Sequence, residues 1–516
     1  MTRRSIRAGA AALVLGLGAL AACSGGDDGG GGEGGAPTEI TMLVLGDKPT
    51  NGRLEDMLVE LNEILVEEAN ATLDLYYIEW ADWQTQYNVQ LLSGDSNVDL
   101  ITTATDWLFA WENADKGAFL PLSEEMLQEY APNTWAQVDA EGHWEVTKLD
   151  GEIYFIPEDN YTQWTNHGFF YRGDWATEAG FADGEITRFE DFTTYFQWVK
   201  DNVPEAYPWD VAGANEAPLT GYLAGHTDLQ TIQQVTAGNY FPFHTHESDP
   251  STVTSWYMEG DELLEAAELA AEWNEIGVWR EDALNYDGDT RELLYSGLSG
   301  ADQHHTQTFV TGIYDNLSTR QPDSDPKFFY WGYENGNYFR DILTHGAMAV
   351  SANSANPEKA LEVYDIVRNN EEAYRLLNYG IEGVDYLVTD DGYLDRPEGW
   401  DASTDSLGSN FWGGRMDEYE LPSVTEYPDK DELYAELDAA AKDYPYETLI
   451  VDQNALSPYL AAMGSVLSEY IPQLQYGKFA DPAAAIEEMR QKLRDAGYEE
   501  ALALVQADLD AMQTQG

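Results

Sequence analysis

The 516-residue chain contains one cysteine, few basic residues and no long apolar run beyond its first 22 residues. A single cysteine cannot form an internal disulfide, so the folded body must be stabilised by packing alone. Lys and Arg number 26 against 94 Asp and Glu, which gives a formal net charge of −68. A field of that sign repels nucleic acid and anionic lipid, so we expect no nucleic-acid partner. A membrane-spanning helix needs roughly 20 consecutive apolar residues, and nothing after residue 22 approaches that length.

The one cysteine, Cys23, follows a basic start and an apolar run, and a Ser-, Gly- and Asp-rich stretch comes after it. A charged start, a short apolar run and a small-residue cleavage site are typical of an export signal. The sequence LAAC at 20–23 resembles the bacterial lipobox, which implies lipidation of Cys23. We therefore expect a signal peptide over 1–22, then a lipidated cysteine and flexible linker over 23–37. The alternative is an ordinary signal peptide with an incidental cysteine.

Aromatic residues are abundant, with 16 Trp and 32 Tyr in a hydrophilic chain. Trp and Tyr are costly to bury completely because their N–H and O–H groups need partners. Flat aromatic faces stack on the C–H faces of sugar rings, while carboxylates and amides accept hydrogen bonds from hydroxyl groups. The combination predicts a site for a neutral oligosaccharide, although core packing is the alternative for any single Trp. The acidic charge is interpreted as a solvated surface, with cation binding as the alternative.

The first 120 residues alternate between strand and helix patterns. We expect strands over 39–45, 73–79 and 98–103, with a helix over 54–65 between the first two and a polar helix starting near Asp82. This order predicts a largely parallel sheet with helices on both faces. Ligands of such sheets bind beyond the carboxyl ends of the strands. The loops expected at that edge are Asp47, 80–83 and 106–107.

Later segments predict further helices over 187–200, 259–276 and 357–378, and a strand over 169–172 that leads into a helix. Asp481 is the expected cap of a helix that has Pro482 in its first turn and ends at Gly497. A final amphipathic helix follows. No internal repeat is visible.

Several blocks in order resemble the extracellular solute-binding lipoproteins of bacterial ABC importers, in the sugar-binding, maltose-binding-like cluster. Within that cluster the chain is most similar to the LipO/LplA-like group, which has an extra C-terminal helical region. The blocks that carry the resemblance are LLSGD at 91–95, VDLI at 98–101, GAFLPL at 117–122, GEIYFIP at 151–157, YRGDW at 171–175, GAMAVSANSANPEKAL at 346–361 and NYGIEG at 378–383.

The resemblance implies an α/β fold with two periplasmic-binding-protein-like lobes, a hinge and additional C-terminal helices. The first lobe is expected to contain 38–157 and 346–395. The second lobe is expected to contain 158–345 and 396–516. Crossings are expected near 157–161, near 338–346 and after about residue 395, with closure about this hinge.

The implied function is a lipid-anchored receptor on the extracellular face of the cell membrane. It captures a carbohydrate, expected to be an oligosaccharide, by lobe closure and delivers it to ABC permease subunits. We expect a monomer without cofactor, bound metal or catalytic residue. The alternatives are a secreted glycan-active hydrolase, a peptide-binding receptor of the same fold, and an adhesin without transport.

Candidate ligand-binding residues follow from loop positions. Asp106 is assigned as a hydroxyl acceptor and Trp107 as a stacking platform, because both follow a first-lobe strand. For Glu382 the alternative is a turn-capping role between two glycines. The full candidate set is Asp106, Trp107, Trp83, Asp159, Asn160, Trp331, Glu382 and Trp412.

Catalytic motifs give no competing prediction. The sequence has no Gly-x-Ser-x-Gly elbow, Walker loop or His-Glu-x-x-His motif. With 94 acidic residues, a carboxylate pair at glycosidase spacing arises by chance. His304-His305 and the pair His244 and His246 could hold a metal, but neither has a third-ligand pattern, so cleft or loop polarity is the alternative.

Overall fold

The computed structural model describes residues 35–93, 97–149, 151–158, 164, 167–212, 218–286, 288, 290–340 and 342–515. The lipidation candidate Cys23 and the ligand-binding candidates Asp159 and Asn160 lie outside these residues. Among the described residues, no helix is both long enough and apolar enough to cross a membrane.

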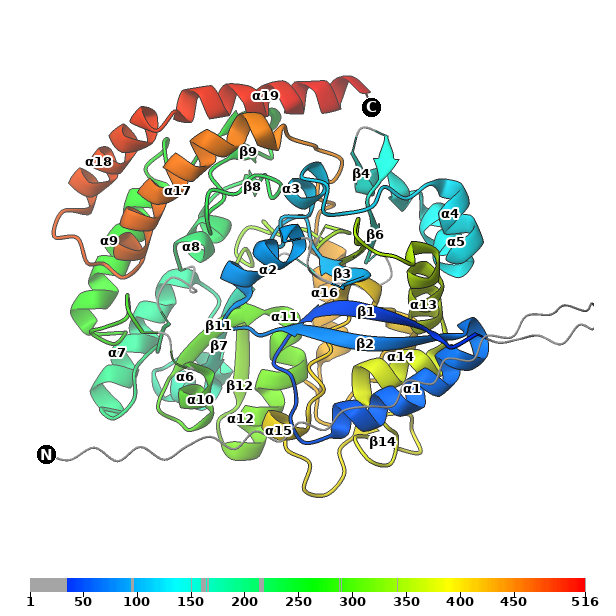
Figure 1. Cartoon of the computed structure of the whole chain (residues 1–516). Coiled ribbons are helices and arrows are strands. Elements are labelled where there is room, and N and C mark those ends of the chain that lie inside the picture. Colours follow the sequence, from blue (N-terminus) through cyan, green and yellow to red (C-terminus); the bar gives the residue numbers. More distant parts are fainter. Residues whose placement is uncertain are drawn as a thin grey trace, which may run out of the picture.

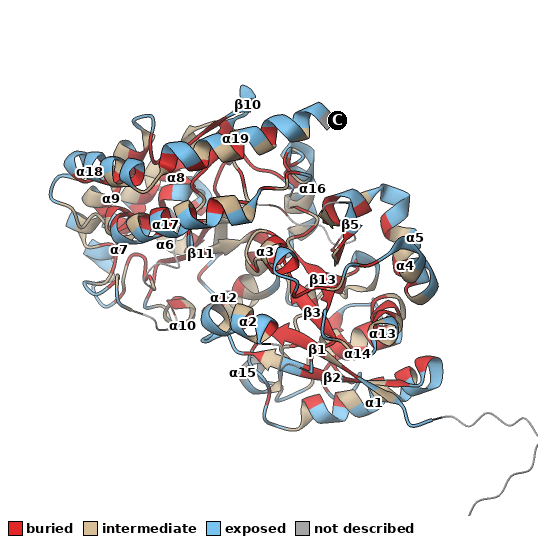
Figure 2. Cartoon of the chain, turned by 45° about the horizontal axis from the view of Figure 1, so that its top comes forward, coloured by how far each residue is buried: buried red, intermediate tan, exposed pale blue. Residues whose placement is uncertain are grey.

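The first lobe is built on a five-stranded sheet with the order β2-β1-β3-β13-β6. Its strands are β1 (Thr38–Leu45), β2 (Ala71–Ile78), β3 (Leu100–Thr103), β6 (Phe155–Pro157) and β13 (Ala347–Val350). Strands β1, β2 and β3 pair in parallel, and β13 pairs antiparallel with both β3 and β6. The largely parallel sheet expected from the sequence is confirmed, with β13 as its single reversed strand. The buried strands β1, β3 and β13 run through the centre of this lobe in Figure 2.

Helices pack around the first sheet through their buried apolar side chains, and α1 shows this most clearly. In α1, Leu54, Met57, Leu61 and Leu65 recur at three- and four-residue spacing and are fully buried. The helices of this lobe are α1 (Arg53–Ala69), α2 (Trp83–Leu92), α3 (Ala110–Asp115), α4 (Glu124–Tyr130), α5 (Pro132–Glu141), α13 (Pro357–Asn369) and α14 (Glu371–Tyr379).

The segment 357–378, expected as one helix, forms two. The Asn370 side chain accepts hydrogen bonds from the backbone N–H groups of Glu372 and Ala373, at 3.1 and 3.2 Å. Asn370 therefore ends α13 and caps α14, in agreement with the preference of Asn for N-cap positions.

The second lobe contains two smaller sheets, both antiparallel, ordered β11-β7-β12 and β10-β9-β8. Their strands are β7 (His167–Arg172), β8 (Leu229–Thr231), β9 (His244–His246), β10 (Asp249–Thr254), β11 (Ala301–His305) and β12 (Pro326–Tyr330). The helices around them are α6 (Gly173–Glu178), α7 (Phe192–Asn202), α8 (Pro218–His226), α9 (Glu262–Ile276), α10 (Thr290–Tyr295), α12 (Tyr314–Arg320) and α16 (Lys430–Ala440).

Three helices end the chain: α17 (Gln453–Gln475), α18 (Pro482–Asp495) and α19 (Tyr498–Gln515). The predicted cap of α18 is confirmed, because Asp481 accepts a hydrogen bond from the Ala484 N–H at 3.0 Å. Leu467, Met489 and Leu509 share one buried cluster with the second-lobe residue Phe169. The C-terminal helices therefore belong to the core of the second lobe. Figure 1 shows α17 and α18 beside α9, and α19 beside α17.

Segments that connect the lobes lie side by side. The Glu158 N–H donates to the carbonyl oxygens of Gly346 and Leu343, at 2.8 and 3.0 Å. The Glu158 carboxylate, which is buried, forms an ion pair with Arg415. Three distant parts of the chain thus meet at one point.

The third connection runs later than the sequence suggested. Phe411 and Met416 are buried in the core of the first lobe. The N–H of Tyr427 donates to the Val310 carbonyl of the second lobe at 3.0 Å. This packing places the third passage nearer residue 420 than the expected position after residue 395, and the complete set of lobe boundaries stays a prediction.

Candidate functional site

Four tryptophan rings gather at the carboxyl edge of the first sheet. Trp80 and Trp83 follow β2, and Trp107 follows β3. The ring centroids of Trp83 and Trp107 are 5.5 Å apart, and Trp412 lies 5.5 Å from Trp107 and 5.6 Å from Trp80. The parallel order of β1, β2 and β3 puts these loops at one edge, as the sequence predicted. Trp80 is 40% exposed, and the other three rings are half-buried.

Backbone contacts fix the tryptophans in place. The indole N–H of Trp107 donates to the carbonyl oxygen of His345 at 2.9 Å. A Cβ atom on Gly346 would lie 2.8 Å from the Trp412 carbonyl oxygen, and one on Gly413 would lie 2.3 Å from that of Ala347. Only glycine allows these two backbones to approach so closely. The return crossing therefore holds both Trp107 and Trp412.

A row of rings continues from the tryptophans into the second lobe. His345 lies 6.4 Å from Trp107 and 6.1 Å from His305, between ring centroids. His305 lies 4.1 Å from His167, and His167 lies 6.0 Å from Trp331. We call the whole set the junction cluster: it consists of Trp80, Trp83, Trp107, Trp412, His345, His305, His304, His167 and Trp331.

The strand ends of the second lobe explain why these histidines converge. His167 begins β7, and His305 ends the antiparallel neighbour β11. Trp331 directly follows β12, on the other side of β7. All three side chains therefore lie at one end of the sheet β11-β7-β12, which is the end that faces the crossing at His345.

The polar groups in and beside the junction cluster are suited to bind the hydroxyl groups of a ligand. The Asp106 carboxylate accepts a hydrogen bond from His345 Nδ1 through Oδ2, at 2.7 Å. Its other oxygen, Oδ1, is buried and has no hydrogen-bond partner among the described residues. A buried carboxylate oxygen gains a strong hydrogen bond when a hydroxyl group donates to it.

Three histidines of the cluster, His167, His304 and His305, are held in the neutral form. Burial lowers the pKa of His167 to about 4, and the neighbouring His345 and Arg291 add to this effect. Burial together with His167 lowers the pKa of His304 to about 2, and the pKa of His305 is also well below its usual range. A neutral imidazole has one donor and one acceptor nitrogen, so it can exchange hydrogen bonds with a hydroxyl group in either direction.

The lobes also meet at a second place, between α3 and the start of α17, which we call the rim contact. Asn454 at the start of α17 donates its side-chain N–H to the carboxylate of Asp115, at the end of α3, at 2.7 Å. Asp115 belongs to the first lobe and Asn454 to the second. The structure thus has the two lobes in contact at a point where hinge motion would separate them.

The structure brings four of the sequence-predicted ligand-binding residues together, namely Asp106, Trp107, Trp83 and Trp412. Trp331 lies at the far end of the row, in the core of the second lobe. Trp331 is almost fully buried. Glu382 does not join them. It is exposed in a turn whose glycine, Gly383, has a φ of 84°, and its ladder partner is Tyr386.

Sequence reasoning missed the histidines as part of the site. His304-His305 stood out as a pair, but the pair indicated a metal alternative, and His167 and His345 carried no local signal. The second pair lies elsewhere: His244 is buried next to Trp256, and His246 pairs with Asp228 at 2.6 Å. Among the described residues, no cluster of metal ligands includes any of these histidines.

Comparison with known families identifies the chain. The family model described as bacterial extracellular solute-binding protein matches residues 56–374, which is more than half of the sequence. The chain belongs to this family. A second model, described as a domain of unknown function (DUF3502), matches residues 445–514, the region of the C-terminal helices. The curated relative is a carbohydrate ABC transporter substrate-binding protein of Streptococcus pneumoniae, 23% identical and aligned over 97% of this chain and 96% of the relative.

Solved structures share the fold over nearly the whole length. The N-glycan transport solute-binding protein NgtS of Streptococcus pneumoniae, in complex with Man1GlcNAc, superimposes with a TM-score of 0.71 at 20% identity, covering 92% of this chain and 99% of NgtS. FusA of S. pneumoniae, in complex with kestose, gives 0.65 at 15% identity, covering 93% of this chain and all of FusA. These likenesses establish the solute-binding fold with two lobes and C-terminal helices.

Proposed function

We propose that this solute-binding protein captures an oligosaccharide between its lobes at the junction cluster and delivers it to the permease subunits of an ABC importer. The observation that carries the proposal is the continuous row of aromatic and imidazole rings from Trp80 to Trp331, with the buried Asp106 carboxylate beside it. Stacking faces and neutral hydrogen-bonding groups together match a polyhydroxylated, uncharged ligand.

The relatives support the same ligand class. A curated relative is named as a carbohydrate ABC transporter substrate-binding protein, and the solved structures of NgtS and FusA contain Man1GlcNAc and kestose. A ligand that contacts both lobes stabilises the closed form by its differential affinity for that form. The permease subunits would recognise this closed form. The protein acts as a monomeric binding protein and has no catalytic role.

A thermal-shift screen tests the proposal. A ligand that binds only the folded state increases the free energy of unfolding by RT ln(1 + [L]/Kd), which is about 2.7 kcal/mol at a ligand concentration of 100 times Kd. The melting temperature rises as a result. We expect a saturable shift with one class among manno-, fructo- and other neutral oligosaccharides. Chromatography of the recovered glycan should show no hydrolysis product. Shifts with peptides alone, or turnover of a glycan, would replace this proposal with the peptide-receptor or hydrolase alternative.

We also propose that Cys23 carries a lipid that holds the body on the extracellular face of the cell membrane. The support is the lipobox-like LAAC sequence together with membership of an extracellular family. Metabolic labelling with palmitate in a bacterial host should label the intact chain and not the Cys23→Ala variant, which should leave the membrane fraction. Equal labelling of both would overturn the assignment.

A further inference from the structure

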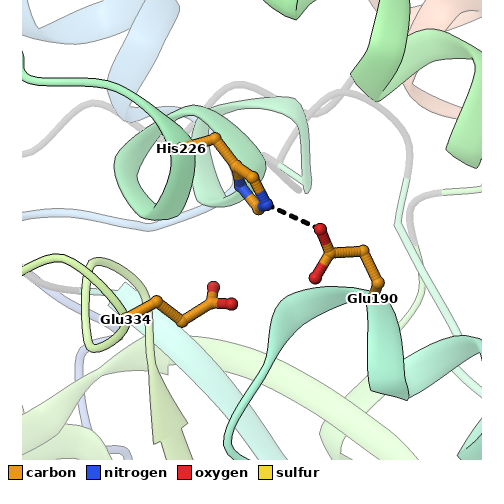
Figure 3. A group of neighbouring side chains, drawn as sticks. All are labelled: Glu190, His226 and Glu334. Atoms are coloured by element: carbon orange, nitrogen blue, oxygen red, sulfur yellow. Dashed lines mark hydrogen bonds and ion pairs between the residues drawn. The ribbon is translucent and has the colours of Figure 1, made fainter.

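A second group of polar side chains converges in the second lobe, outside the junction cluster. Glu190 lies in a short 3-10 turn (Phe189–Asp191), His226 ends α8, and Glu334 lies in the turn after β12. One ligand atom from each lies within 4.8 Å of the others. Figure 3 shows the His226 ring facing the Glu190 carboxylate, with the Glu334 carboxylate beside them.

The hydrogen bonds of His226 decide what its second nitrogen can do. Nδ1 lies 2.6 Å from the carbonyl oxygen of Tyr222. A carbonyl only accepts, so Nδ1 carries the proton and donates it. In the neutral ring Nε2 then presents a lone pair, and it lies 2.7 Å from Glu190 Oε1, another acceptor. Two acceptors at this distance need a cation between them, either a proton or a metal ion.

His226 also has the support that metal-binding histidines usually have. Such histidines donate their other ring N–H to a carboxylate or a backbone carbonyl, which fixes the tautomer and orients the ring. The Tyr222 carbonyl provides this contact. The Tyr222 ring stacks on His226 at 3.9 Å between centroids and an interplanar angle of 4°, so the imidazole is fixed before any ion arrives.

The third side chain, Glu334, adds a half-buried carboxylate. Its Oε2 atom is buried and has no hydrogen-bond partner among the described residues. Burial raises the pKa of Glu334, and Glu190 adds to the rise. A Cβ atom on Gly225 would lie only 2.7 Å from Glu334 Oε2. The glycine thus leaves room for the carboxylate to reach the end of α8.

The cationic side chain of Arg188, which lies near these three residues, does not fill the same role. Arg188 contacts the other oxygen of Glu190 at 3.4 Å, and its side chain is 64% exposed. An ion pair of this kind contributes little. Arg188 and Glu334 border a cavity of about 640 Å³, which gives a small ion a route to the carboxylates.

We propose that Glu190, His226 and Glu334 form a binding site for a divalent transition-metal cation of the Zn²⁺ class, with one nitrogen and two oxygen ligands from the protein. In zinc sites these bonds measure about 2.0–2.2 Å, and three protein ligands leave a fourth position for water. Tetrahedral ligand atoms at such bond lengths are about 3.3–3.6 Å apart. The ligand atoms lie within 4.8 Å of one another, so the two glutamate side chains shift to reach that geometry when the ion binds. Imidazole disfavours Mg²⁺ and Ca²⁺, which prefer oxygen ligands.

The position of the site indicates what the ion does. It joins the turn at Glu190, the end of α8 and the turn after β12. A Cβ atom on Gly221 of α8 would lie 2.5 Å from the ring of Trp331, so α8 already packs closely against this member of the junction cluster. A bound ion ties α8 to the segment that carries Trp331 and stabilises the second lobe.

Titration of the full-length protein after dialysis against EDTA tests the proposal. We expect calorimetry with ZnCl2 to show one saturable equivalent, and the melting temperature to rise with Zn²⁺ concentration. MgCl2 and CaCl2 at the same ionic strength should reproduce neither effect, which separates the site from general attraction of cations to a chain of net charge −68. Absence of a saturable equivalent overturns the proposal.

Matched variants locate the ion. Glu334→Gln keeps the shape of the side chain and should weaken Zn²⁺ binding at least tenfold, as should His226→Gln. His246→Gln is the control, because His246 also pairs with a carboxylate in this lobe, that of Asp228, and it should bind Zn²⁺ like the wild type. Circular dichroism confirms that each variant is folded. Equal affinity of Glu334→Gln and the wild type, or loss in the His246→Gln control alone, overturns the assignment.

Discussion

Replacing Trp107 with alanine should weaken oligosaccharide binding more than any comparable change outside the junction cluster. Trp107 lies at the centre of the tryptophan group, 5.5 Å from both Trp83 and Trp412. Its N–H is already bonded to the His345 carbonyl. The ring is therefore held in one orientation, and a sugar that stacks on it pays little to order it.

The size of the effect follows from buried area. A stacked sugar covers roughly a third of the 150–250 Å² that an aromatic side chain buries, or about 50–80 Å². At about 25 cal/mol per Å² this contributes about 1.3–2 kcal/mol, which is roughly 10- to 30-fold in Kd. Trp107→Phe keeps a ring and loses the N–H, so its affinity should lie between those of the wild type and Trp107→Ala.

The control is Trp135→Ala. Trp135 is a half-buried residue of α5, in the same lobe, and stacks on Trp144 at 5.1 Å and 18°. Its loss should lower the melting temperature and leave Kd within about twofold of the wild type. Calorimetric titration of folded variants with the oligosaccharide identified by the thermal-shift screen provides the comparison. Equal affinity of Trp107→Ala and the wild type, or an equal loss in Trp135→Ala, would refute the assignment of the site.

Further outcomes follow from the connections and the charges. Arg415→Ala leaves the buried Glu158 carboxylate without this ion pair, so the free energy of unfolding in urea should fall by about 3–5 kcal/mol; an unchanged value would contradict the inferred role of the pair. Because the pKa of His167 is lowered in the folded protein, His167 becomes protonated in the unfolded chain at a higher pH than in the folded chain. The free energy of unfolding should therefore fall as pH drops from about 6.5 to about 4. Melting curves should show a smaller fall in His167→Gln, whereas identical pH profiles would speak against neutral burial. Asn454→Ala removes the rim contact with Asp115 and should weaken oligosaccharide binding two- to fivefold, mainly through a faster dissociation rate in stopped-flow fluorescence; an unchanged rate would show that the contact does not hold the lobes together. Added NaCl should raise the melting temperature of a chain with net charge −68 by screening its self-repulsion, and a fall over the first 0.5 M would contradict that explanation.

Local patterns predicted the elements whose causes are local. The spacing of Leu54, Met57, Leu61 and Leu65 predicted α1, and Asp481 predicted the start of α18. The parallel order of the first strands even placed Trp83 and Trp107 together, because parallel strands bring their following loops to one edge.

Contacts between distant segments could not be predicted in this way. Asp106 and His345 are 239 residues apart in sequence, and no periodicity relates them. His167 and His305 meet because β7 and β11 are antiparallel, a pairing that the sequence did not specify. The return of Phe411 to the first core has no local signature either.

Glu190, His226 and Glu334 show the same limit in the second lobe. Each residue is unremarkable in its own segment, and the three approach one another only when α8 packs beside the turn after β12. By contrast, the two histidine pairs that are visible in the sequence form no cluster of metal ligands among the described residues. Proximity in sequence was thus a poor guide to proximity of ligand atoms.

The most direct test of the account is a distance measurement between the lobes with and without oligosaccharide. The chain from residue 24 onward has no cysteine, so Lys116→Cys and Ser457→Cys can carry spin labels at exposed positions next to the Asp115–Asn454 contact. The account predicts a broad distribution with longer distances in the free protein, and a single short distance when the oligosaccharide is bound. Saturating binding of an oligosaccharide with no change in the distribution would contradict capture by lobe closure.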